Sequence, residues 1–141
     1  MLREINLPKS WDHESDVVVI GSGNAGLPAA IEAARAGAKV TVLEQAKEPS
    51  GSLTVFYGKH VTFVNTDFQK KQGVTDSTDK YYEDAMRVTR GDPSLWKALV
   101  EQNAETYKFF VGLGAEPAEL WRLPGHSVPR GHFFRVITAY F

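Results

Sequence analysis

Two short apolar runs enclose an alanine-rich stretch near the start of the chain. The first run, residues 17–20, reads Val-Val-Val-Ile, a β-branched composition that is typical of a buried central strand. The second run, residues 40–43, reads Val-Thr-Val-Leu. The alanine-rich stretch between them predicts a helix, and Gly37 suits the left-handed residue that closes it. The pattern therefore predicts a strand–helix–strand unit over residues 16–44.

The pattern becomes less regular after this unit. Residues 45–58 are rich in Gly, Ser, Pro and Lys and predict a loop. Residues 61–64, Val-Thr-Phe-Val, predict a short strand. Beyond Pro117 the spacing of proline and glycine is typical of a fixed loop.

Two helices are predicted between the short strand and this last loop. Asp76-Ser77 is an N-cap signal for a helix over roughly residues 78–90. Asp92-Pro93 begins a second helix, whose wide apolar face continues as far as residues 112–114. We interpret the aromatic side chains of this helix as core. The fold class is therefore α/β, with a βαβ unit followed by a mainly helical segment.

Three glycines follow the first strand at G-x-G-x-x-G spacing, and an acid ends the second strand. Gly21 permits the sharp turn, Gly23 leaves no Cβ between the backbone and a pyrophosphate, and Gly26 lets the helix pack closely on the sheet. The N-terminal end of the helix would face the diphosphate. Glu44 can accept hydrogen bonds from both hydroxyls of an adenosine ribose and would repel a 2′-phosphate. A glycine-rich turn of another α/β protein is the alternative, but strand, helix and acid together favour a dinucleotide site.

Composition excludes several classes of function. The net charge is −1 and there is no basic block, so nothing indicates a nucleic-acid partner. The absence of cysteine excludes disulfides and thiolate metal sites, and no metal site is predicted. No apolar run approaches membrane-spanning length, and the polar start of the chain lacks the apolar core of a signal peptide. We therefore expect a cytoplasmic protein.

Several stretches together resemble the flavoprotein family of fumarate reductase, succinate dehydrogenase and 3-ketosteroid Δ1-dehydrogenase. Residues 16–30 and 36–44 are similar to the family's opening and its FAD adenosine site. Residues 48–52 resemble its Gly-Gly-Ser/Asn turn, which lies along the diphosphate and the flavin. Residues 73–77, the Tyr-Tyr-Glu-Asp helix and residues 109–116 resemble the helices that follow. The resemblance implies the N-terminal part of a Rossmann-like FAD-binding domain.

The resemblance also implies FAD as a noncovalently bound cofactor. Leu53 lies near the position at which some members carry the histidine that bonds covalently to FAD, and its identity favours noncovalent flavin. Ser50 stands where the family usually has glycine. The residues expected to contact the cofactor lie on the glycine turn, at the end of the second strand and in the following loop: Gly21, Ser22, Gly23, Asn24, Ala25, Gly26, Glu44, Gln45, Gly51 and Ser52.

Arg130-Gly131-His132 resembles the Arg-x-His stretch that introduces a substrate-contacting histidine in soluble fumarate reductases. The resemblance implies a substrate contact at Arg130 or His132, and a structural loop histidine is the alternative for His132. In this family FAD exchanges a hydride with a carbon of a C–C bond next to a carboxylate or ketone. The expected substrate is an enoate, a dicarboxylate or a ketosteroid.

We expect residues 1–141 to form an incomplete FAD-binding domain. Its parts are the βαβ unit 16–44, a cofactor-side loop and short strand 45–64, helices over 76–114, and a loop 115–141 leading toward a missing substrate domain. The chain alone is expected to be inactive, because the family's proton-transfer arginine and clamp domain lie beyond it. Two alternatives stay open: an NAD-binding dehydrogenase module, and a noncatalytic fragment completed by self-association or a partner chain.

Overall fold

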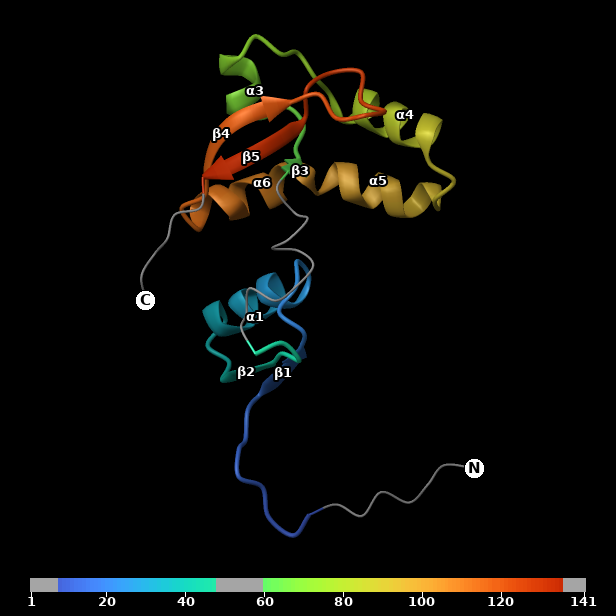
Figure 1. Cartoon of the computed structure of the whole chain (residues 1–141). Helices are drawn as coiled ribbons and strands as arrows, with labels where there is room; N and C mark the ends of the chain where they lie inside the picture. The colour runs from blue at the N-terminus through green and yellow to red at the C-terminus, as the bar shows by residue number, and fades with distance from the viewer. Residues whose placement is uncertain (1–7, 48–59, 136–141) are drawn as a thin grey trace. The chain divides into compact units, whose positions relative to one another are not determined.

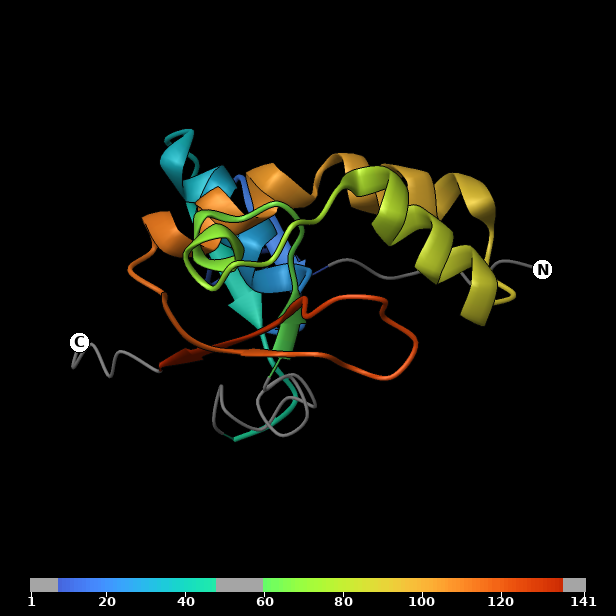
Figure 2. The same cartoon turned by 90° about the horizontal axis from the view of Figure 1, so that it is seen from above.

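The computed structural model describes residues 8–47 and 60–135, and the chain divides into two compact units between residues 58 and 59 (Figure 1). Within the described residues, the N-terminal unit contains two strands and one helix. Residues 60–135, the described part of the C-terminal unit, contain three strands and four helices, which Figure 2 shows from a second direction.

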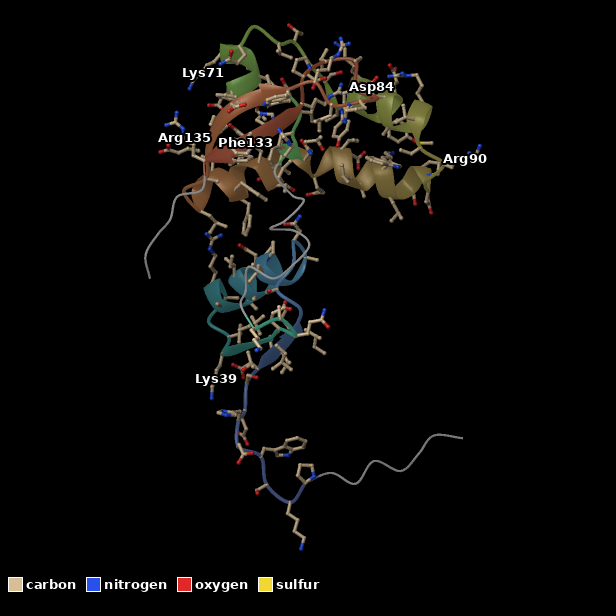
Figure 3. All side chains as sticks on the ribbon, viewed as in Figure 1. Lys39, Lys71, Asp84, Arg90, Phe133 and Arg135 are labelled. Carbon is tan, nitrogen blue, oxygen red and sulfur yellow. The ribbon has the colours of Figure 1, made fainter. Side chains whose placement is uncertain are left out.

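A parallel strand pair with a helical crossover makes up the N-terminal unit. β1 (Val17–Ile20) lies beside β2 (Val40–Leu43). Val17 lies opposite Val40, and Ile20 lies opposite Leu43. α1 (Gly26–Arg35) connects them. At the start of the pair, the Asp16 carboxylate accepts a hydrogen bond of 2.8 Å from the backbone N–H of Lys39, a residue whose side chain is labelled in Figure 3. The predicted strand–helix–strand order is observed.

The two faces of this strand pair differ in their cover. α1 packs against both strands, and a Cβ placed on Gly26 at the start of α1 would lie 3.2 Å from a methyl group of Val19. Side chains alternate across a strand, so Val18 and Ile20 point to the opposite face. Ile20 is 85% exposed there, and Leu43, opposite it on β2, is 52% exposed. Parallel sheets normally bury both faces, and no described residue of the N-terminal unit covers this apolar face.

An antiparallel sheet forms the centre of the C-terminal unit. β5 (Gly131–Arg135) lies between β3 (His60–Thr62) and β4 (Glu116–Trp121) and pairs with both. The register shifts between Pro117 and Glu119, where β4 is irregular. The loop predicted over residues 115–141 is therefore wrong for residues 116–121 and 131–135. Proline is tolerated in an edge strand such as β4, because its missing N–H is not needed on the unpaired side.

Besides this sheet, residues 60–135 contain four helices: α3 (Asp67–Lys71), α4 (Thr78–Val88), α5 (Pro93–Glu101) and α6 (Asn103–Gly112). Both views show α5 and α6 following one another in a row, with α4 packed against α5 (Figures 1 and 2). The prediction missed α3, whose five residues are too few to show a helical period.

The single helix predicted from Asp92-Pro93 to residues 112–114 is divided into two. α5 ends at Glu101, and α6 begins at Asn103. The Asn103 side chain accepts a hydrogen bond of 2.7 Å from the backbone N–H of Val64 and donates one of 3.0 Å to the carbonyl of Thr62. This buried amide connects the junction of the two helices to the end of β3. The apolar pattern of the sequence continues across the junction, so the sequence alone does not indicate that the helix is interrupted there.

The core of the C-terminal unit is aromatic. Phe63 is fully buried, and its ring makes edge contacts with Tyr107, Phe110 and Phe134 at centroid distances of 5.2, 5.6 and 5.9 Å. A second buried cluster contains Val64, Tyr81 and Val100. Tyr107 and Phe110 of α6 are half-buried and pack against this core through Phe63, so the prediction of core aromatics holds for them only in part.

Candidate cofactor site

The glycine turn at the end of β1 is shaped by two close approaches. Gly21 has a φ of +97°, in the region that favours glycine, and its N–H donates a hydrogen bond of 2.7 Å to the carbonyl of Leu43. A Cβ on Gly26 would overlap the carbonyl oxygen of Gly21, well inside the distance that real Cβ atoms show. Only glycine at position 26 lets α1 begin this close to the end of β1.

The N-terminal end of α1 carries no side-chain cap and no acid in its first turn. The first turn of a helix has N–H groups without partners inside the helix, and its dipole favours a negative charge. Asn24 and Ala25, which lead into the helix, are exposed. Pro28 occupies the first turn, where a missing N–H is tolerated. This end of α1 has the features of a diphosphate-binding helix terminus.

The Glu44 carboxylate follows β2 and is held by three hydrogen bonds. Its Oε2 accepts from the Ser22 hydroxyl at 2.6 Å and from the Ser22 N–H at 2.8 Å, and its Oε1 accepts from the Ala46 N–H at 3.0 Å. These bonds, that from the Ser22 hydroxyl foremost, lower the pKa of Glu44 to about 2. The carboxylate is therefore ionised at neutral pH and fixed beside the glycine turn.

The structure brings most of the predicted cofactor residues together. The turn from Gly21 to Gly26 and the Glu44-Gln45 pair lie side by side, joined by the bonds between Ser22 and Glu44. The predictions for Gly51 and Ser52, and those based on Ser50 and Leu53, fall outside the described residues.

Arg130 lies in the C-terminal unit, buried in a cluster of charged side chains. Its guanidinium makes ion pairs with Asp76, at 2.7 Å, and with Asp84, at 2.6 Å, and all three side chains are nearly inaccessible. A second nitrogen reaches the other Asp76 oxygen at 2.7 Å, and the guanidinium lies 4.9 Å from the Tyr81 ring centre. Figure 3 labels Asp84 on α4. Burial acts to lower the pKa of Arg130, but its bonds to Asp76 and Asp84 outweigh it and raise the pKa above the ordinary value.

The sequence analysis missed both acidic partners of Arg130. Asp76 was considered only as part of the Asp76-Ser77 cap signal, in which Ser77 is the cap and accepts the Lys80 N–H at 3.1 Å. Asp84 shares one helix face with apolar neighbours, and an acid on such a face is a signal that it pairs with a buried cation. Burial acts to raise the pKa of Asp84, but bonds from Ser127, Arg130 and Arg87 hold it below its usual range.

His132 is fully buried, with both ring nitrogens engaged. Its Nδ1 lies 2.7 Å from the Arg130 carbonyl, which can only accept, so Nδ1 carries the proton. Its Nε2 lies 2.9 Å from the Thr66 hydroxyl and accepts from it. Burial lowers the pKa of His132, and the bond to the Arg130 carbonyl opposes this only in part. The ring is therefore neutral at pH 7 and connects β5 to the start of α3.

Among residues 8–47 and 60–135, no group of three or more His, Cys, Asp or Glu side chains is placed to hold a metal ion. No helix in the same residues is long and apolar enough to cross a membrane.

Comparison with known proteins identifies the domain to which this site belongs. A family described as an FAD binding domain matches residues 16–135. The chain belongs to this FAD-binding domain family. The match includes the glycine turn, Glu44 and the Arg130 cluster, so both described units are parts of the family's domain. The prediction of FAD as the cofactor is confirmed.

Several relatives of this FAD-binding domain are flavoprotein reductases. The chain is 37% identical over 123 residues to the acrylate reductase flavoprotein subunit of Shewanella woodyi, covering 85% of this chain and 24% of the relative. It is 35% identical over 119 residues to fumarate reductase (cytochrome) of Shewanella frigidimarina, covering 83% and 21%. The resemblance to the fumarate reductase group is thereby confirmed.

Solved structures give the same grouping for this FAD-binding domain. The 3-ketosteroid-Δ4-(5α)-dehydrogenase of Rhodococcus jostii RHA1, in complex with 4-androstene-3,17-dione, has a TM-score of 0.78 at 30% identity, over 92% of this chain and 32% of that chain. The open conformation of a flavocytochrome c3 fumarate reductase has a TM-score of 0.76 at 33% identity, over 84% and 21%. The chain thus spans between a fifth and a third of these proteins.

Proposed function

We propose that residues 16–47 form the adenosine and diphosphate part of a Rossmann-like FAD site. The longer protein would be a flavin-dependent oxidoreductase acting on a C–C bond next to a carboxylate or ketone. The observation that carries the proposal is the Glu44 carboxylate, held ionised at the end of β2 beside the glycine turn. FAD, when bound, supplies the two-electron redox chemistry. The chain's own residues bind and orient it.

Each part of the turn has a separate task in this proposal. The N–H groups of Asn24 and Ala25, which lead into α1, and of Gly26, its first residue, face the diphosphate. Gly21 and Gly23 keep side chains out of the way of its oxygens. Glu44 accepts from the adenosine ribose, with Gln45 beside it. Gly51 and Ser52 are proposed to continue along the diphosphate and the flavin.

The substrate side of the proposal rests on the relatives. Their names describe reduction of acrylate and fumarate and dehydrogenation of a ketosteroid, so a small enoate, dicarboxylate or ketosteroid is the proposed substrate class. A substrate contact by Arg130 or His132 stays a prediction. It would require a change in the hydrogen bonds of both residues, because their polar atoms bind Asp76, Asp84 and Thr66 in the structure.

We further propose that the chain functions as part of a longer flavoprotein or together with a completing chain, including a second copy. Two observations support this layout. The chain spans 24% and 21% of the two reductases above. Among the described residues of the N-terminal unit, nothing covers the apolar face at Val18, Ile20 and Leu43, which a further layer of the domain would bury. A cytoplasmic location stays a prediction.

Replacing Glu44 by alanine should weaken FAD binding roughly 10- to 100-fold. The substitution removes the charged acceptor for the ribose and leaves the diphosphate-binding end of α1 intact. Titration of the 141-residue chain with FAD at fixed salt, followed by flavin fluorescence, measures the change. Glu32→Ala, on the exposed surface of α1, is a matched control and should leave the affinity unchanged. Equal affinity of Glu44→Ala and the unchanged chain would remove Glu44 from the site.

The flavin should be bound noncovalently. Leu53 stands near the usual attachment position and has no nucleophilic atom that could bond to the flavin. After acid precipitation of the FAD-loaded chain, the yellow colour should remain in the supernatant. Flavin that stays with the washed pellet would contradict the noncovalent assignment.

A further inference from the structure

Ser22 lies inside the glycine motif, yet both of its donors bind the Glu44 carboxylate at the end of β2. The hydroxyl donates to Glu44 Oε2 at 2.6 Å, and the backbone N–H donates to the same oxygen at 2.8 Å. Ser22 is 5% exposed, whereas the Glu44 carboxylate is only half-buried, so the serine is the shielded member of the pair. Two donors from one residue therefore converge on one carboxylate oxygen.

The chemistry of a hydroxyl limits what else Ser22 can do. A serine hydroxyl carries one hydrogen, and a diphosphate at neutral pH offers only acceptors. Once that hydrogen is donated to Glu44, the Ser22 hydroxyl presents only lone pairs to any phosphate oxygen, and such a contact is repulsive. Ser22 therefore acts at the ribose end of the site and not at the diphosphate end.

The same bonds determine how Glu44 can recognise a ribose. A carboxylate oxygen has two lone-pair positions. Ser22 fills both positions of Oε2, whereas the Ala46 N–H, at 3.0 Å, fills only one position of Oε1. Oε1 is therefore the oxygen with more room for a further donor, and the Gln45 N–H also interacts with this carboxylate. A carboxylate fixed by three donors also loses less conformational freedom when a ligand binds.

We propose that Ser22 is a positioning residue for the adenosine ribose of FAD. It holds the Glu44 carboxylate so that Oε1 receives a ribose hydroxyl, and it makes no bond to the diphosphate. The proposal rests on the proposed FAD site and goes further, since it assigns Ser22 a role that acts only through Glu44.

A double-mutant cycle on the 141-residue chain tests this role. Ser22→Ala removes only the hydroxyl oxygen, and FAD affinity, measured by flavin fluorescence, should fall by about 3- to 10-fold. In a chain that already carries Glu44→Ala, the same substitution should cause no further loss, because the hydroxyl then has no carboxylate to orient.

A second measurement needs no cofactor and separates positioning from general stability. The pKa of Glu44, followed by carbon NMR of its carboxylate, should rise in Ser22→Ala toward the ordinary value of about 4.3. The matched control is Ser94→Ala. Ser94 also donates its hydroxyl and its N–H to one carboxylate oxygen, that of Asp92, at 2.7 and 2.8 Å, but it lies in the C-terminal unit. Ser94→Ala should change neither the Glu44 pKa nor the FAD affinity.

The outcomes distinguish this role from the FAD site itself. If Ser22→Ala weakens binding equally with and without Glu44, Ser22 contacts the cofactor directly and the positioning role is wrong, while the FAD site stands. An unchanged affinity or an unchanged Glu44 pKa in Ser22→Ala also overturns it. If Glu44→Ala itself has no effect on FAD binding, the ribose site is wrong, and the role of Ser22 with it.

Discussion

Replacing Arg130 by methionine should lower the free energy of unfolding of the C-terminal unit by about 3–5 kcal/mol at pH 7. Methionine fills a similar volume without a charge, so packing is largely preserved. Asp76 and Asp84, however, would remain buried without their cation. An unpaired charge in the interior is among the costliest defects that a single substitution can introduce.

The expected loss depends on pH. The pKa of Asp84 lies below its unfolded value in the intact chain, so its ionisation adds stability above pH ~4 that is lost as the pH falls. Without Arg130 one of the bonds that lower this pKa is absent. The difference in unfolding free energy between the two chains should therefore stay nearly constant from pH 7 to about 5 and shrink as the pH falls below about 4.

Urea unfolding followed by tryptophan fluorescence measures this loss, because Trp96 packs against Tyr81, 6.4 Å between ring centres, beside the cluster. The matched control is Arg87→Met. Arg87 pairs with the same Asp84 at 2.7 Å but is 60% exposed, so its removal should cost less than about 1 kcal/mol. Equally small effects of the two substitutions would show that the buried pairs contribute no net stability.

The N-terminal unit could be predicted from sequence because its determinants are local. The glycine spacing, the strand before it and the acid after the second strand all lie within residues 16–44, and β1, α1 and β2 follow their predicted order. The close approach of Gly26 to Gly21 needs no information from outside this stretch. The hydrogen bond from the Ser22 hydroxyl to Glu44 could not be predicted, because it depends on the rotamer of the Ser22 side chain.

The C-terminal unit could be predicted only in part, because distant pairings determine it. β5 pairs with β3, which lies about 70 residues earlier in the chain. Both strands are too short for their hydrophobic pattern to predict this pairing. The burial of Arg130 depends on Asp76 and Asp84, which lie 54 and 46 residues earlier. A charged residue considered by itself in the sequence suggests an exposed position or a substrate contact. In the folded chain the side chains of Arg130, Asp76 and Asp84 are instead buried together.

The 141-residue chain loaded with FAD should show no steady-state enoate reductase or ketosteroid dehydrogenase activity. Turnover needs the cofactor, a substrate-polarising group and a proton donor, held together in a site closed to water. A missing general acid typically costs about 10²- to 10⁴-fold, and lost positioning can cost more. The described residues include the proposed ribose and diphosphate contacts, but the two candidate substrate residues already bind other groups. Arg130 is bound by two aspartates, and His132 by Thr66 and the Arg130 carbonyl.

Assays with fumarate, acrylate and a 3-ketosteroid, with artificial electron donors and acceptors, test this expectation against free FAD at equal concentration. The Glu44→Ala variant distinguishes the activity of bound FAD from that of free FAD. Activity that depends on the proposed site must fall when the affinity for FAD falls. Turnover well above free flavin that is lost in Glu44→Ala would contradict the expectation. It would mean that the polarising and proton-donating groups come from these 141 residues or from a second copy of the chain. Since Arg130 and His132 are the candidates, Arg130→Met and His132→Gln would then have to abolish turnover without lowering FAD affinity.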